Sequence, residues 1–547
     1  MTKIPLKSAS ALFFGALLMG CGSAGPVGGL ILTPVENIDS TPLKIEELTK
    51  AEKEQWGHLD LVADTIPGMS VNKAYEEIIK GNKGKKVIVA VLDAGVDLDH
   101  EDLDDVLWTN KKEKPGNNKD DDKNGYVDDI HGYNFLGDSY HEQLEFTRML
   151  RLNIGDQATL AKAREKLESE RTEAQQNKQQ YEQILQAVTN ADNAMKKHLG
   201  KDSYTKQEVA AVTPKDEGMQ RNVAILTQMF GIKETIPEVL EELGDGVKYF
   251  TEQLNYNLKE DFDGRNVVGD DPYDLNDTDY GDGNPDIRTD DESHGTHVAG
   301  IIAAERNNGI GMNGVANNVE IMSIRAVPNG DEYDKDIALG IRYAVDNGAK
   351  VINASFGKSF SPRAEWVYDA LKYAAEKDVL FVHAAGNDGA DLDDPNNPNF
   401  PNDQVNNGPE MVNNVITVGA LDPKYGSEML ASYSNYGKVN VDIFAPGTDV
   451  YSAYPNNTYK FSPGTSMAAP NVSGIAALLF SQYPKLSAAQ VKDIILRSGV
   501  PVNATVILGG DNTNTARLRE ISTTGKIANA YNALIMADKV VKGQLKL

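Results

Sequence analysis

GKKVIVAVLDAG, residues 84–95, is the stretch that decides the fold of this chain. Its six consecutive apolar residues, Val87 to Leu92, lie between two glycines and predict a strand that is buried on both faces of a parallel sheet. Similar apolar runs recur at 319–327, 351–356, 379–385, 415–420 and 441–444, with helical patterns between several of them, as at 337–345 and 364–375. This alternation predicts an α/β fold with a doubly wound, mostly parallel sheet.

The segment from residue 139 to 260 breaks the alternation. It is polar and has no strong strand run, but its apolar residues recur at helical spacing, as at Leu160, Ala163 and Leu167. The pattern predicts one or two long amphipathic helices, followed by shorter helices around 223–230 and 239–254. We interpret 139–260 as a helical insertion into one domain formed by residues 41–138 and 261–547. Its role stays open between a solvated decoration and a substrate gate or partner surface.

Charge and composition exclude one class of function. The 547 residues are 40% hydrophobic, which suffices for a large core. The formal net charge of −27 becomes −29 once a leader containing Lys3 and Lys7 is lost. Such a chain repels nucleic acid and favours cations, so we expect no nucleic-acid partner.

The first 20 residues have the make-up of a secretory leader. Two lysines precede an apolar stretch from Ala11 to Met19, which is too short to span a bilayer. Leu-Met-Gly-Cys at 18–21 resembles the lipobox of bacterial lipoproteins, in which the cysteine is acylated. Cys21, the only cysteine of the chain, is therefore the predicted lipidation site, and residues 21–40 are the predicted flexible tether. We expect an exported protein, anchored by lipid in the bacterial cell envelope; the alternative is cleavage at another small residue beside a stray cysteine.

Three separate stretches carry the groups that acyl transfer needs. Asp93 ends the first strand, His294 lies in SHGTHVAG at the start of a helical pattern, and Ser466 lies in GTSMAAPNVSG at the start of another. Such chemistry requires an activated hydroxyl, a neutral imidazole and an orienting carboxylate. No histidine follows His383, so Ser466 cannot belong to an α/β-hydrolase, in which the histidine comes after the serine. Each residue taken alone could instead cap a strand or a helix.

Four motifs together resemble the subtilisin-like serine proteases, or subtilases: VIVAVLDAGVD around Asp93, SHGTHVAG, AAGND around Asn387, and GTSMAAPNVSG. The resemblance covers roughly residues 84–137 and 261–500. It implies that Asp93 orients the histidine, His294 acts as base and then as acid, and Ser466 attacks a peptide carbonyl. Asn387 would donate its amide to the oxyanion. The implied function is a serine endopeptidase acting on proteins or peptides; the rival is a catalytically silent scaffold that uses the insertion as a partner surface.

The same resemblance implies a substrate cleft, but the sequence departs from the family pattern at three positions. Residues 355–357 and 384–386 would flank the side chain before the scissile bond, with contacts from Ser355, Phe356, Gly357, Ala385 and Gly386. Ala94 stands where a serine or threonine is usual, Asn471 replaces a histidine, and Lys358 replaces a glycine. The small residues in the cleft predict room for a medium or large apolar group of the substrate, whereas Lys358 would favour acidic neighbours. His297 and His383 are interpreted as structural.

An acidic loop predicts a metal site. The spacing D-x-D-x-N-G from Asp120 resembles an EF-hand-like calcium loop, in which oxygens at alternate positions converge on a hard cation. The predicted ligands are Asp120, Asp122, Asn124, Tyr126 through its carbonyl, Asp128 and Asp129. His131 occupies the place of the usual closing glutamate. We therefore expect a structural Ca²⁺, with an acidic solvated turn as the alternative.

Other metal patterns are weaker. A second acidic stretch at 270–291 lacks the spacing of a calcium loop. Two zinc-protease patterns fail, because Asp104 and Glu145 stand where H-E-x-x-H needs its second histidine.

Overall fold

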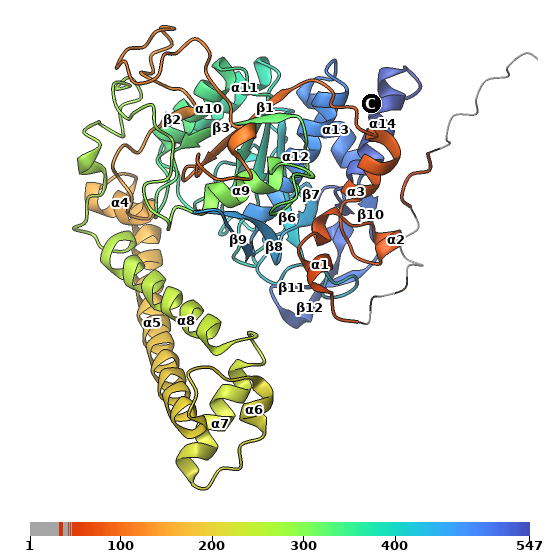
Figure 1. Cartoon of the computed structure of the whole chain (residues 1–547). Coiled ribbons are helices and arrows are strands. Elements are labelled where there is room, and N and C mark those ends of the chain that lie inside the picture. Colours follow the sequence, from red (N-terminus) through yellow and green to blue (C-terminus); the bar gives the residue numbers. More distant parts are fainter. Residues whose placement is uncertain (1–31, 37–41, 43, 45) are drawn as a thin grey trace, which may run out of the picture. The chain divides into compact units, whose positions relative to one another are not determined.

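The computed structural model describes residues 32–36, 42, 44 and 46–547 (Figure 1). The predicted leader, Cys21 and most of the predicted tether lie outside these residues. The chain divides into Met1–Pro34 and Val35–Leu547, and the second unit is described below. Within the described part of the chain, no helix has both the length and the apolar character needed to cross a membrane.

A nine-stranded sheet forms the centre of this unit, in the order β10-β13-β7-β6-β5-β4-β1-β3-β2. All neighbouring pairs are parallel except β10 with β13. The bounds are β1 (Val87–Asp93), β2 (Gly132–Asn134), β3 (Val319–Arg325), β4 (Val351–Ala354), β5 (Leu380–Ala384), β6 (Val415–Leu421), β7 (Ile443–Pro446), β10 (Val500–Pro501) and β13 (Lys526–Ile527). The predicted fold class is confirmed.

Helices cover both faces of the sheet (Figure 1). One buried layer joins α10 (Asp334–Asp346) and α11 (Ala364–Glu376) to Leu92, Ile324 and Phe381 of the strands. The other includes α9 (His294–Ala303) and α12 (Thr465–Gln482), which contacts β1 and β4 to β7. The last helices are α13 (Ala488–Ser498) and α14 (Ala530–Val541). Because strands bear apolar side chains on both faces, they could be recognised as continuous apolar runs.

Residues 145–252 form five helices: α4 (Glu145–Leu152), α5 (Gln157–Leu199), α6 (Lys206–Ala210), α7 (Glu217–Met229) and α8 (Ile236–Glu252). The single helix α5 has 43 residues; Asp156 caps its start by accepting the N–H of Thr159. Helix α8 packs against α5 at Gly246, where an added Cβ would lie 2.2 Å from the Tyr181 ring. Glycine is therefore needed at 246 for the two helices to approach this closely.

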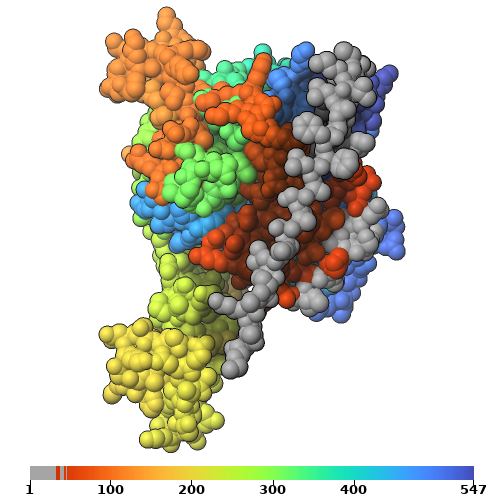
Figure 2. All heavy atoms as spheres, turned by 45° about the vertical axis from the view of Figure 1, so that its right-hand side comes forward, coloured from red at the N-terminus to blue at the C-terminus, as the bar shows by residue number. Residues whose placement is uncertain are grey.

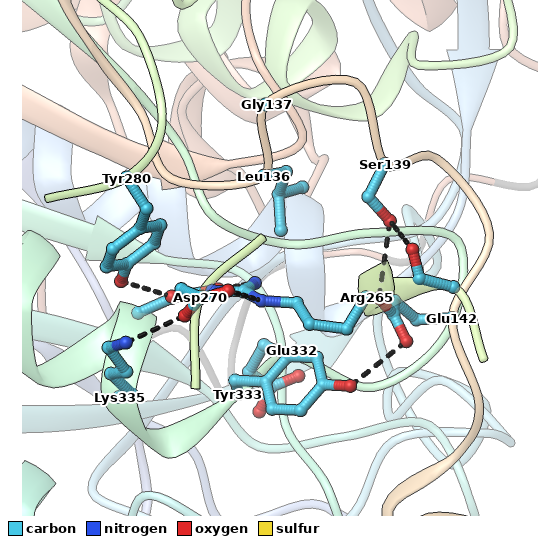
Figure 3. Close-up of polar contacts among 12 residues, drawn as sticks. Leu136, Gly137, Ser139, Glu142, Arg265, Asp270, Tyr280, Glu332, Tyr333 and Lys335 are labelled. Atoms are coloured by element: carbon cyan, nitrogen blue, oxygen red, sulfur yellow. Dashed lines mark hydrogen bonds and ion pairs between the residues drawn. The ribbon is translucent and has the colours of Figure 1, made fainter. Parts of the chain in front are cut away.

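Buried ion pairs hold the segment after α8 against the start of α10 (Figure 3). The Arg265 guanidinium pairs with Asp336 at 2.6 Å and with Asp270 at 2.7 Å. Lys335 pairs with Asp270 at 2.7 Å, and the Tyr280 hydroxyl donates to Asp336 at 2.6 Å. Asp270, from the second acidic stretch, is thus neutralised by two protein cations and has no need of a metal ion.

The first described helices, α1 (Lys50–Lys53), α2 (Leu61–Asp64) and α3 (Val71–Ala74), belong to a segment that reaches the C-terminal helix. The Tyr531 hydroxyl donates to Glu77 at 2.6 Å, and the Asn529 amide donates to Ser70 at 2.8 Å. Figure 2 shows this red segment beside blue C-terminal residues. The two ends of the described unit therefore stabilise each other.

Two hairpins were not predicted from the sequence: β8 (Val450–Tyr454) with β9 (Thr458–Ser462), and β11 (Thr505–Leu508) with β12 (Asp511–Arg517). The second hairpin lies between α13 and α14. Its strand β12 reads DNTNTAR and is mostly exposed, so it lacks the alternation of apolar and polar residues by which strands are recognised.

Candidate active site

Asp93 and His294 meet at the carboxyl end of β1. His294 is the first residue of α9, and its Nδ1 lies 2.7 Å from Oδ1 of Asp93. The Ala94 N–H donates to the same oxygen at 2.8 Å. Oδ2 of Asp93 is buried and has no hydrogen-bond partner among the described residues. The methyl group of Ala94 cannot donate to it.

The carboxylate changes the basicity of the imidazole. Loss of water around the His294 ring lowers its pKa, but the negative charge of Asp93 and the hydrogen bond outweigh this effect, so the pKa is raised above its usual value of 6.5. The His294 side chain keeps 40% of its surface exposed, whereas Asp93 keeps 1%. The buried acid therefore fixes one side of the ring and leaves the other accessible from the cleft.

Ser466 is the second residue of α12 and is half-buried. Its Oγ donates to the carbonyl of Ser355 at 3.1 Å. No hydrogen bond joins it to His294 within the described structure; in many hydrolases this contact closes only when substrate is bound. Pro470 lies inside the helix rather than in its first turn, so it cannot donate to the Ser466 carbonyl. The Ser355 hydroxyl donates there instead, at 2.8 Å.

Two buried polar residues that the sequence analysis missed support Ser355. The Asn353 amide donates to the Ser355 hydroxyl at 2.9 Å, and the Ser473 hydroxyl donates to the side-chain oxygen Oδ1 of Asn353 at 2.8 Å. Both Asn353 and Ser473 are fully buried. The signal was an asparagine inside the apolar run VINASF, because buried polar side chains are kept only where they form hydrogen bonds.

Asn387 lies beside the start of α12. Its Oδ1 accepts the N–H of Thr465 at 2.9 Å and the Thr465 hydroxyl at 3.0 Å. This fixes the orientation of the amide, so that Nδ2 is left to donate elsewhere. The Ser466 N–H lies in the first turn of α12 and has no acceptor within the helix. Two donors are thus available beside the nucleophile, which is the arrangement that stabilises an oxyanion.

A cleft of about 900 Å³ opens over these groups. His294 and Asn387 border it, as do the predicted contact residues Ser355, Phe356 and Gly357, together with residues 327–332. Residues of α8, in the segment predicted as a helical insertion, form part of the wall.

Residues behind the cleft hold its wall in place through hydrogen bonds. Ala385 is fully buried, and its carbonyl accepts the amides of Asn399 and Asn435, both at 3.0 Å. Ala385, which is predicted to contact substrate, is thus buried behind the cleft wall. The Gly386 N–H is likewise used by the Thr465 hydroxyl at 3.0 Å.

His297 and His383 are buried and bond to main-chain carbonyls. Nε2 of His297 donates to Lys460 at 3.1 Å, and Nε2 of His383 donates to Phe356 at 2.8 Å. Burial lowers the pKa of each imidazole to about 4, so both stay neutral. The second contact holds the cleft wall at Phe356.

Lys358 does not face a substrate, contrary to the prediction. It is buried, and its ammonium group pairs with Glu145 at 2.7 Å and with Asp334 at 2.9 Å. Glu145 also pairs with Arg148 at 2.6 Å. The Arg148 guanidinium donates to the carbonyl of Glu332 at 2.9 Å. These contacts of Lys358, Glu145 and Arg148 therefore connect α4 to the two segments that border the cleft, residues 327–332 and 355–357.

Three carboxylates converge at the acidic loop: Glu113, Asp120 and Asp122, whose ligand atoms lie within 4.8 Å of one another. Glu113 is 7% exposed, and its Oε2 has no hydrogen-bond partner in the described chain. Such an orphaned, buried carboxylate oxygen fits a hard cation. Gly125 adopts a φ of 96°, which allows a sharp turn in the loop.

The other predicted ligands are engaged elsewhere. Both oxygens of Asp128 accept main-chain N–H groups, from Asn117 at 3.2 Å and Asn118 at 2.8 Å. Asp129 accepts the Tyr343 hydroxyl at 2.7 Å, and burial raises its pKa to about 6. The Asn124 side-chain oxygen accepts the N–H of Tyr126 at 2.8 Å. Glu113 was missed because it lies outside the D-x-D-x-N-G pattern.

Comparison with known proteins identifies the family of the chain. The model of the subtilase family matches residues 157–525, which is more than half of the chain. His294, Asn387 and Ser466 lie inside this range. Asp93 lies before it, so the place of Asp93 in the site depends on its 2.7 Å contact with His294.

Individual relatives match shorter stretches. A thermophilic serine proteinase of Bacillus sp. (strain AK1) is 44% identical over 223 residues, which cover 41% of this chain and 49% of the relative. Thermitase of Thermoactinomyces vulgaris is 40% identical over 190 residues, which cover 35% and 61%. A solved protease structure from Pseudoalteromonas arctica PAMC 21717 covers 88% of this chain and 97% of its own, at 21% identity and a TM-score of 0.45. The chain thus spans less than two thirds of these curated relatives, and the match to the family model shows that it belongs to the subtilase family.

Proposed function

We propose that this protein is an exported serine endopeptidase that hydrolyses peptide bonds through an acyl-enzyme on Ser466. One observation carries the proposal: the 2.7 Å contact between Asp93 and His294 at the edge of a cleft. The start of α12 brings Ser466 to the same cleft wall, 3.1 Å from the Ser355 carbonyl. The rival function, a silent scaffold, gains no support, because every group of the reaction is present.

Each of these residues has its own role in the proposed reaction. Neutral His294 takes the proton of the Ser466 hydroxyl while Oγ attacks the carbonyl carbon of the peptide. The negative oxygen that forms is held by the Ser466 N–H and by Nδ2 of Asn387, and the helix N-terminus favours this charge. His294 then gives the proton to the leaving amine. Water attacks the acyl-enzyme by the same steps and regenerates Ser466.

Hydrolysis of an internally quenched peptide by the purified chain tests this function. The imidazole must be neutral to accept a proton, so kcat/KM should rise with pH through the His294 pKa. Because Asp93 raises that pKa, the midpoint should lie above 6.5. A clean preparation that cleaves no peptide across pH 5–10 would exclude the enzyme.

The lipid anchor is a separate part of the proposal, supported by the leader and by the sole cysteine, Cys21. Replacing Cys21 with serine removes the thiol that would be acylated. We expect the unmodified protein to fractionate with membranes and the variant to be released. Equal membrane association of both proteins would argue against acylation at this residue.

We also propose a structural Ca²⁺ held by Glu113, Asp120 and Asp122. When bound, the ion would offset two of the three negative charges and link residue 113 to the 120–125 loop. A ligand at 100 times its Kd stabilises a folded protein by about 2.7 kcal/mol. Adding Ca²⁺ to chelated protein should therefore raise the Tm by a few degrees, measured by calorimetry.

Two variants locate the ion. Glu113→Gln should abolish most of the Ca²⁺-dependent rise in Tm. Asp104→Asn is the matched control, because Asp104 belongs to a second, largely exposed carboxylate cluster with Asp105 and Glu305. If the control removes the rise and Glu113→Gln does not, the assignment of the site is wrong.

A further inference from the structure

The charged residues that border the cleft over His294 are mainly carboxylates. Its cations are Lys248 and Lys460. The carboxylates are Asp93, Glu241, Asp245, Glu252, Asp290, Asp291, Glu292, Asp331 and Glu332. The acidic residues come from four separate parts of the chain: the end of β1, helix α8, the loop before α9, and the loop before α10. The surplus of negative charge is therefore a property of the cleft and not of one local stretch.

Helix α8 presents an acidic face to the cleft. Glu241, Asp245 and Glu252 are spaced by four and seven residues, which places them on one side of a helix. Contacts at both ends hold this face in place. Glu241 lies 3.7 Å from Lys460 of β9, and Glu252 accepts the Asn329 amide at 2.8 Å.

Part of the charge is already compensated. Asp291 pairs with Lys248 at 2.5 Å, and Glu292 pairs with buried Arg325. Asp331 accepts the N–H of Glu145 at 2.8 Å. Asp245 and Asp290 form no hydrogen bond and no ion pair with any described residue. The two lysines of the cleft thus leave a net negative surface around the catalytic histidine.

Glu332 lies at the wall that the cleft shares with a smaller hollow beside Phe356 and Tyr368. It is 3% exposed, and Figure 3 shows it beside the Tyr333 ring. Lys358 donates to its main-chain carbonyl at 2.7 Å. No side chain in the described structure donates a hydrogen bond to its carboxyl group. Burial, with added repulsion from Asp331 and Asp334 against attraction from Lys358, raises the pKa of Glu332 to about 8.

The Glu332 carboxyl group accepts its own main-chain N–H, and a ligand that donates to it would add a further hydrogen bond. Lys358 is not free for this purpose, because its ammonium group is held by Glu145 and Asp334. A cationic side chain entering from the cleft would donate such a hydrogen bond and would favour the ionised form of Glu332. Glu332 therefore adds a specific contact to the diffuse attraction of Asp245 and Asp290.

We propose that the cleft selects polypeptide substrates that carry a lysine or arginine in the segment filling it, with Glu332 accepting that side chain. The proposal rests on the proposed endopeptidase function and names its substrate class. Glu332 binds the basic side chain directly, and Asp245 and Asp290 raise its local concentration. The acidic face of α8 makes the helical segment a part of the substrate site.

Binding to the full-length Ser466→Ala variant tests charge selection without requiring hydrolysis. Fluorescence anisotropy is measured with sets of labelled peptides of one neutral sequence, in which each position in turn is alanine, lysine or glutamate. Lysine at one position or more should tighten binding about tenfold over alanine, and glutamate there should weaken it. The preference should shrink from 50 to 500 mM salt, because the rim charges are screened.

Further substitutions in the Ser466→Ala variant test which residues cause the preference for lysine. Glu332→Gln should reduce the lysine-to-alanine affinity ratio about tenfold at one position. Asp245→Asn, at an exposed residue, should reduce the lysine-to-alanine affinity ratio about twofold. This variant replaces Glu332→Gln in the test if Glu332→Gln does not fold. Glu165→Gln, at an exposed residue on α5, is the matched control and should leave the ratio unchanged.

The outcomes separate the two proposals. Equal affinities for the lysine, alanine and glutamate peptides overturn charge selection, whether or not the wild type cleaves them. A lysine preference that survives both Glu332→Gln and Asp245→Asn overturns the assigned residues. Lysine-selective binding without cleavage by the wild type would retain the acidic cleft and reject the endopeptidase.

Discussion

Ser466→Ala is expected to lower kcat for peptide hydrolysis about 10⁶-fold, a magnitude known from subtilisin, a member of the same family. The reason is that the variant lacks the only oxygen placed to form the acyl-enzyme. The alanine methyl group fits the same space, so neither the fold nor the hydrogen bond from Ser355 to the residue 466 carbonyl should change. Residual hydrolysis, measured over days with a quenched peptide, reports what binding and oxyanion donors achieve alone.

Ser462→Ala is the matched control for this experiment. Ser462 ends β9, four residues before Ser466, and its side chain forms no hydrogen bond within the described structure. It should retain wild-type kcat and KM. A Ser466→Ala protein that keeps more than about one hundredth of wild-type kcat would contradict the assigned nucleophile, provided that both variants melt at the same temperature.

Asp93→Asn is expected to lower kcat about 10⁴-fold. The asparagine amide can donate to Nδ1 of His294, which favours the wrong tautomer for a base. The substitution also removes the charge that raises the His294 pKa, and burial, which lowers it, is left to act. The acid limb of kcat/KM should therefore move to lower pH while the maximum falls, as measured from pH 5 to 10.

The exposed residue Asp99 offers a control for Asp93→Asn, because Asp99→Asn removes the same charge at the surface. Asp99→Asn should change neither the rate nor the pH profile.

Asn387→Ala removes one oxyanion donor and should lower kcat about 10²–10³-fold. The loss of kcat should thus be largest for Ser466→Ala, smaller for Asp93→Asn and smallest for Asn387→Ala. If the acid limb of the pH profile does not shift in Asp93→Asn, the electrostatic role of Asp93 is refuted.

The sheet could be predicted from the sequence because its strands are buried on both faces. The runs beginning at Val87, Val319 and Val351 match β1, β3 and β4 to within a few residues. The polar hairpin strand β12 could not be recognised, since tertiary contacts rather than periodicity define it. Helix α5 was recognised as helical, but its unbroken length of 43 residues was not.

The chemistry of the site was predictable where it depends on a local motif. Asp93, His294 and Asn387 each follow a strand or start a helix, and such ends converge at one edge of a parallel sheet. Contacts between distant segments were not predictable. Lys358 was expected in the cleft, yet Glu145, more than 200 residues away in the chain, holds it in the interior. Glu113 likewise joins the acidic loop only through the fold.

The most direct test of the central claim is labelling with a fluorophosphonate, which reacts only with an activated serine hydroxyl. We expect the purified protein to take up one label, located on Ser466 by mass spectrometry of the peptides. Labelling should be lost in Ser466→Ala and slowed in Asp93→Asn. A folded wild-type protein that remains unlabelled, or a label found on another serine, would contradict the assignment of Ser466 as the nucleophile.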